Sequence, residues 1–65
     1  MTLKGARANK NLTQAQAAKA LGISTDTLSN YERGKTYPSV EIIKRIEDLY
    51  EVTYAELIFL PRGTV

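Results

Sequence analysis

The amino-acid sequence predicts an all-α domain of five short helices, and three observations support this class. Two capping boxes begin at Thr13 and Thr53, because each Thr is followed three residues later by Gln or Glu. Gly22 and Gly34 stand where helices would end, since glycine adopts the left-handed conformation at little cost. From Val40 to Tyr50, apolar side chains recur at helical spacing and charged ones occupy the other face.

Local signals set the expected boundaries of each helix in turn. The expected helices cover residues 2 to about 10, 14 to about 21, 25 to 33, 40 to 50 and 54 toward 59. Ser24 and Ser39 are the expected N-caps of the third and fourth helices, because a serine oxygen accepts a hydrogen bond from a free backbone N–H. Pro38 lacks an N–H and biases Tyr37 toward an extended backbone, so a loop is expected before Ser39. The last helix follows the second capping box and is expected to run toward Phe59.

The length and composition exclude several classes of function. The 65 residues suffice for one small domain spanning 1–65. The chain has no cysteine and no histidine, which excludes disulfides and thiol nucleophiles and removes the commonest general base and metal ligand. We therefore expect no enzymatic activity, no metal and no cofactor. No stretch approaches the roughly 20 apolar residues of a membrane span and no signal sequence opens the chain, so a cytoplasmic protein without membrane contact is expected.

The net charge of +2 is unevenly distributed along the chain. Residues 1–37 carry six basic and two acidic side chains, a net charge of +4. Residues 38–65 carry three basic and five acidic side chains, a net charge of −2. The first part could therefore face a polyanion while the second does not. Small proteins also show such asymmetry by chance, so the charge alone does not identify a partner.

The third expected helix presents a polar face to solvent. On a helical wheel with Thr25 at 0°, Leu28 and Tyr31 fall at about 300° and about 240°, so the buried direction is about 270°. Five polar side chains share the opposite arc: Thr25, Asp26, Ser29, Asn30 and Arg33. Such a face is often merely solvated, but solvated faces usually carry long Glu and Lys side chains, which are missing here. Short polar side chains instead suit a helix that lies in the major groove of DNA.

The base edges of the major groove offer hydrogen-bond partners to the short side chains of this face. Asn30 can pair with adenine N6 and N7 through both ends of its amide, and Ser or Thr can exchange a hydrogen bond or contact a thymine methyl. Asp26 would repel phosphates, so it should either accept from cytosine N4 or be neutralised by a nearby cation. Arg33 and Lys35 lie at the end of the helix and just after it, where they would reach phosphates.

The segment from Thr13 to Ser39 resembles a known family. Its pattern is Thr-Gln-x-x-x-Ala-x-x-Leu-Gly-Ile-Ser-x-x-Thr-Leu-Ser-x-Tyr-Glu-Arg-Gly-Lys-x-x-Pro-Ser. This pattern is similar to that of the lambda-repressor-like helix-turn-helix family, which includes the Cro and XRE-type bacterial and phage regulators. The resemblance implies a compact five-helix bundle forming a single DNA-binding domain. It also implies a transcriptional regulator, of repressor type, that binds double-stranded operator DNA as a homodimer.

The resemblance assigns roles to individual positions. Gln14 looks like the residue that contacts a phosphate and supports the reading helix. The base-reading positions correspond to Thr25, Asp26, Ser29 and Asn30, and the backbone-contacting positions to Arg33 and Lys35. A frequent structural ion pair of the family maps onto Arg7 and Glu32, which is reasonable because Glu32 falls near the buried side of the wheel. Glu51 departs from the pattern, since the family typically has Gly there, so an altered helix end or an unusual backbone is expected.

The C-terminal segment leaves two further readings open. Five large apolar residues crowd into seven positions: Tyr54, Leu57, Ile58, Phe59 and Leu60. A final core helix would bury part of this set, and the remainder could form a two-fold interface that places two reading helices one DNA turn apart, about 34 Å. Alternatively, the chain is an antitoxin-like or protein-interaction module that uses this apolar surface to bind a partner.

Overall fold

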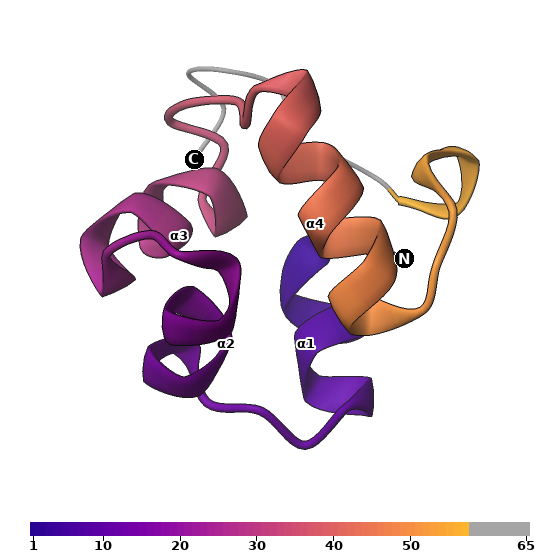
Figure 1. The fold of residues 1–65 in the computed structure, drawn as a ribbon, viewed down its shortest axis with the longest axis horizontal. Coiled ribbons are helices and arrows are strands. Elements are labelled where there is room, and N and C mark those ends of the chain that lie inside the picture. Colours follow the sequence, from indigo (N-terminus) through magenta and orange to yellow (C-terminus); the bar gives the residue numbers. More distant parts are fainter. Residues whose placement is uncertain (58–65) are drawn as a thin grey trace.

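The computed structural model describes residues 1–57 and confirms the all-α class. The described part contains four α-helices and one 3-10 turn: α1 Leu3–Asn9, α2 Gln14–Leu21, α3 Thr25–Glu32, α4 Val40–Tyr50 and η1 Tyr54–Glu56. Figure 1 shows α2 and α3 against each other on one side of the molecule, with α1 and α4 on the other. The first four helices begin and end within one or two residues of the expected positions.

The expectation of a fifth α-helix was wrong for the residues that the structure describes. The second capping box is formed, because the Glu56 carboxylate accepts a hydrogen bond from the Thr53 N–H at 2.9 Å, and this bond lowers the pKa of Glu56. Only the single turn η1 follows it, however, and Leu57 leaves the helix with φ −86° and ψ 137°. This extended backbone lets Leu57 reach the core, where it is only 8% exposed. Residues beyond Leu57, including the expected end at Phe59, lie outside the described residues.

Side-chain caps begin all four α-helices. Thr2, Thr13, Ser24 and Ser39 have an extended backbone, and each side-chain oxygen accepts from the N–H three residues further on at 3.0 to 3.3 Å. Because the first N–H groups of a helix have no partner within it, each cap satisfies a donor that the helix itself leaves unpaired. The two serines and the Thr13 capping box expected from the sequence are thereby confirmed.

All four α-helices also end in the same way, with one residue in the left-handed conformation. Asn11, Gly22, Gly34 and Glu51 have φ of 58°, 76°, 76° and 56°. The N–H of the next residue then bonds back to the carbonyl five positions earlier, as from Ile23 to Ala18 at 3.0 Å. This arrangement is the Schellman motif, which closes a helix and turns the chain sharply. The unusual backbone expected at Glu51 is therefore present.

The core lies between the four α-helices. Leu21, Leu28, Ile46 and Tyr50 are its largest fully buried side chains, and they come from α2, α3 and α4. Ala17 and Ala18 are 0% and 2% exposed, and these small side chains let α3 pack closely across α2. The helix pair is thus held by the core, with α1 and α4 behind it. None of the helices described is long and apolar enough to cross a membrane.

We predict that Glu51→Gly stabilises the protein relative to Glu51→Ala. Both variants lose the ion pair that Glu51 makes with Lys10, but only glycine relieves the left-handed backbone of its Cβ strain. Thermal unfolding followed by circular dichroism should place the glycine variant about 3 to 6 °C above the alanine variant. Equal melting temperatures would show that Glu51 carries no backbone strain.

Candidate nucleic-acid interface

The turn between α2 and α3 is fixed by α4. Gly22 has φ 76°, and a Cβ built there would lie 3.3 Å from Nη1 of Arg45 on α4. The same Arg45 nitrogen donates to the carbonyl oxygen of Leu21 at 3.1 Å, which places a positive charge at the C-terminal end of α2. The left-handed conformation therefore favours glycine here, and the end of the Arg45 side chain would have to shift slightly to admit a larger residue.

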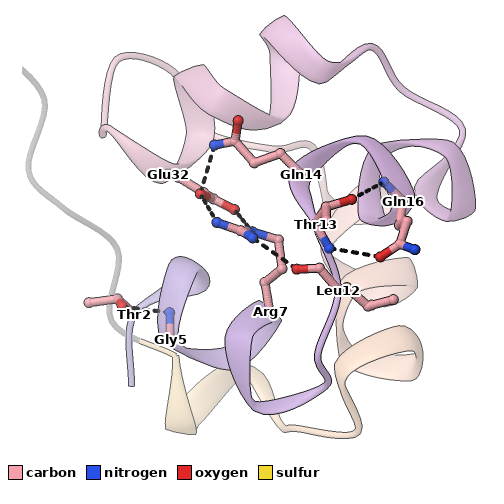
Figure 2. Close-up of polar contacts among 8 residues, drawn as sticks. All are labelled: Thr2, Gly5, Arg7, Leu12, Thr13, Gln14, Gln16 and Glu32. Atoms are coloured by element: carbon pink, nitrogen blue, oxygen red, sulfur yellow. Dashed lines mark hydrogen bonds and ion pairs between the residues drawn. The ribbon is translucent and has the colours of Figure 1, made fainter.

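A second set of contacts joins α3 to the two preceding helices (Figure 2). Arg7 of α1 forms a two-point ion pair with Glu32 of α3: its Nε lies 2.7 Å from Oε2, and its Nη2 lies 3.2 Å from Oε1. The Nη1 of Arg7 donates to the carbonyl oxygen of Leu12 at 2.9 Å. Gln14, the first residue of α2, donates from Nε2 to Glu32 Oε1 at 3.0 Å. One carboxylate therefore connects three helices.

This ion pair is largely removed from water. The side chains of Arg7 and Glu32 are 13% and 4% exposed. The hydrogen bond with Glu32 raises the pKa of Arg7, so its charge is maintained at any ordinary pH. A buried charge is expensive unless it is paired and hydrogen-bonded, and here each carboxylate oxygen has at least one donor. The contact therefore strongly favours one orientation of α3 relative to α1 and α2.

Tyr50 of α4 packs beneath this network. Its ring belongs to the core, and its hydroxyl is buried without a hydrogen-bond partner among the residues described. Burial and, to a smaller extent, the nearby Glu32 carboxylate together raise the pKa of Tyr50 to about 12, against the opposing charge of Arg7. Its hydroxyl therefore stays neutral next to the ion pair.

The polar face expected on α3 lies at the surface of the molecule. Thr25, Asp26 and Arg33 are exposed, while Ser29 and Asn30 are partly buried. On the same helix Leu28 is 0% exposed, so the buried and polar sides are clearly separated. The structure thus presents these five side chains on a short helix whose other side is anchored in the core.

The charges near this face are sparse. Asp26 forms no ion pair with any residue in the described part of the chain, so the neutralising cation considered for it is not provided there. Lys35 is exposed just after the helix, and its backbone N–H donates to the carbonyl of Asn30 at 2.9 Å. Because Arg7 neutralises Glu32, the charges that remain on α3 and its loop are one carboxylate and two cations.

Among the contacts that the sequence reasoning missed, two involve α3 and the turn before it. Arg33 Nη2 donates to the side-chain oxygen of Asn30 at 3.0 Å, joining two side chains that were treated as independent. Their spacing of three residues was the available signal, since such pairs are neighbours on a helix surface. The contact of Arg45 with Leu21 had no local signal, because the two residues are 24 positions apart.

Gln14 lies where it can serve two partners. It is partly buried at the N-terminus of α2, and one N–H of its amide is used by Glu32. An amide nitrogen carries two hydrogens, so one remains for a further acceptor. Gln14 therefore supports α3 through Glu32 and keeps a second amide N–H close to the surface.

These features define a helix-turn-helix unit, in which a second helix is held firmly by the first and presents a polar face. A family model described as helix-turn-helix matches residues 3–57 of the chain. The protein belongs to this family, and the resemblance to Cro and XRE-type regulators is confirmed. No solved structure matches the chain significantly.

Several relatives of known name are similar to this chain. It is 43% identical over 56 residues to the HTH-type transcriptional activator BcrR of Enterococcus faecalis, covering 86% of this chain and 28% of that protein. It is 36% identical over 56 residues to the antitoxin PezA of Streptococcus pneumoniae, covering 86% and 35%. It is 40% identical over 47 residues to the cryptic phage CTXphi transcriptional repressor RstR of Vibrio cholerae, covering 72% and 42%. The chain thus spans less than half the length of each.

We predict that Glu32→Gln lowers the free energy of unfolding by about 2 to 3 kcal/mol, because it leaves a nearly buried guanidinium without its counter-charge. The control is Glu41→Gln, which breaks an exposed pair with Arg45 whose atoms lie 3.5 Å apart and should cost under about 0.5 kcal/mol. Urea unfolding of both variants measures the difference. Equal losses would mean that the buried pair contributes no more than a surface one.

Proposed function

We propose that this protein is a sequence-specific DNA-binding transcriptional regulator that inserts α3 into the major groove of an operator. The observation that carries the proposal is the short polar face of α3, held by the core on one side and by the Arg7–Glu32 ion pair at its end. A rigid helix with short side chains can approach base edges closely. Membership of the helix-turn-helix family supports this function.

Base reading is assigned to the N-terminal and central part of the polar face. Thr25 and Asp26 occupy the first turn of α3, and Ser29 and Asn30 follow one turn later. In this position Asp26 accepts from a cytosine amino group, which is consistent with its lack of a cation among the residues described. These four residues set which sequence is bound.

Backbone contacts are assigned to the edges of the same surface. The free N–H of Gln14 donates to a phosphate at the N-terminus of α2, where the helix dipole also favours an anion. Lys35 and Arg33 add positive charge at the other end of α3. Such contacts fix the position of the domain on the duplex but carry no sequence information.

Two variants separate base reading from backbone attraction. Asn30→Ala should cost roughly 1 to 3 kcal/mol on the specific operator and relax the preference at one base pair. Lys35→Met should weaken binding to every sequence alike and reduce the slope of log affinity against log salt by roughly one. Fluorescence anisotropy titrations with operator and random duplexes at several salt concentrations measure both. If Asn30→Ala lowered both affinities equally, its base-reading role would be disproved.

We further propose that the protein acts as a repressor and binds its operator as a homodimer. The name of the similar protein from Vibrio cholerae is that of a repressor, which supports the first part. For the second part, the exposed apolar side chain in the predicted interface is Tyr54, which is 55% exposed. Leu57 packs into its own core and does not contribute, and Ile58, Phe59 and Leu60 lie outside the described residues.

Dimerisation on DNA is tested by sedimentation of the protein with a palindromic duplex. We expect a complex with two protein chains per duplex, and Tyr54→Ala should lower the cooperativity of the two half-sites. Val40→Ser is the control, because Val40 is 71% exposed and apolar but lies at the start of α4. A complex with one chain per palindromic duplex at micromolar concentration would contradict the homodimer.

A protein-interaction role is the second candidate, and the similarity to a protein named as an antitoxin favours it. In this case the apolar surface near η1 would bind a partner protein. The two functions are compatible, since DNA binding and partner binding use different surfaces. They separate experimentally, because Asn30→Ala should weaken specific DNA binding while leaving partner binding intact.

A further inference from the structure

The contact between Arg33 and Asn30 changes which base the polar face is suited to read. Arg33 Nη2 lies 3.0 Å from Asn30 Oδ1, and both residues lie on the polar arc of α3. A guanidinium carries only donors, so the atom facing it must be the amide oxygen and not the amide nitrogen. The orientation of the Asn30 amide is therefore determined by its partner.

The backbone around the pair is also fixed. The Asn30 carbonyl accepts from the Lys35 N–H at 2.9 Å, and the Arg33 N–H donates to the Ser29 carbonyl at 3.0 Å. Gly34, with φ 76°, closes the helix directly after Arg33. Both side chains thus start from a backbone that the helix end holds in place.

This contact leaves the pair with more unused donors than acceptors. The Asn30 amide nitrogen has two N–H groups, and four of the five guanidinium N–H groups remain after one is given to Asn30. Adenine presents one acceptor and one donor in the major groove, so reading it through both ends of the amide would require the Asn30 oxygen to accept from adenine N6 with its second lone pair while Arg33 occupies the first. Guanine presents two acceptors, N7 and O6, which match a surface made of donors.

We infer that Arg33 is a positioning residue that holds Asn30 with its amide nitrogen toward the groove, so that the pair selects guanine rather than adenine. The inference rests on the proposed function, gives Arg33 a role in base selection in addition to its charge, and adds the identity of one base. In solution such an exposed pair is weak. At an interface with DNA, where part of the surrounding water is displaced, the charge on Arg33 strengthens its bond to the amide oxygen.

The test is selection of bound duplexes from a random pool with the wild type, Asn30→Ala, Arg33→Met and Lys35→Met. The base pair that loses its preference in Asn30→Ala identifies the position that the pair reads. We expect guanine there for the wild type. Arg33→Met keeps a long apolar stem but frees the Asn30 oxygen, so the ratio of guanine to adenine at this position should fall roughly tenfold. Lys35→Met is the matched control, which loses one cation and should bind all sequences more weakly without changing the base.

A second measurement alters the DNA and leaves the protein unchanged. Replacing the selected guanine with 7-deazaguanine removes the N7 acceptor, and wild-type affinity should fall roughly tenfold. Selection of adenine by the wild type, or an unchanged guanine preference in Arg33→Met, would overturn the inference while leaving the proposed function intact. Enrichment of no sequence at all by the wild type would overturn the proposed function and the inference together.

Discussion

The orientation of α3 depends on one carboxylate. Glu32 accepts hydrogen bonds from Arg7 of α1 and from Gln14 of α2, and Arg7 also holds the carbonyl of Leu12 in the connection between these helices. Because the pair is nearly excluded from water, breaking it would leave an unpaired charge inside the domain. The helix that carries the polar face therefore cannot tilt without a large cost. Packing of Leu28 and the alanines of α2 fills the space, but apolar contacts alone tolerate sliding, whereas a two-point ion pair specifies direction.

The frame behind this network shows how a domain of 65 residues remains ordered. Every α-helix has a side-chain cap at its start and a left-handed residue at its end, so few backbone groups are left without partners. Helices this short contribute little stability by themselves, since the first turn costs more than it returns. The caps and the shared core therefore stabilise the short helices, and all four α-helices depend on each other for their stability. Among the buried side-chain nitrogen and oxygen atoms of the described residues, the Tyr50 hydroxyl has no hydrogen-bond partner and is tolerated next to the ion pair.

Local sequence signals predicted most of this frame. Threonine and serine caps, glycine stops and the apolar spacing of α4 act over three to eight residues, so they could be read without knowing the fold. The end of the chain could not be predicted in this way. Thr53 and Glu56 form their capping box, but burial of Leu57 favours leaving the helix over extending it, and a capping box contains no information on helix length. The roles of the polar residues on α3 could likewise be predicted only in part from the sequence. Composition and spacing indicated a reading face, whereas the bond between Arg33 and Asn30 depends on which rotamers the two side chains adopt.

The shortness of α3 limits how much one domain can discriminate. Eight residues rise about 12 Å, so α3 placed along the major groove as proposed would extend over about four base pairs. A sequence of four base pairs recurs by chance roughly once in every few hundred, against about 10⁶ to 10⁹ competing positions in a genome. The closing turn at Gly34 ends the helix, so α3 offers no further turn to the groove in the proposed complex. The length of α3 therefore limits how many base pairs a single copy can read. Stronger contacts by α3 would increase its affinity for DNA far more than they would reduce the number of matching sites in a genome.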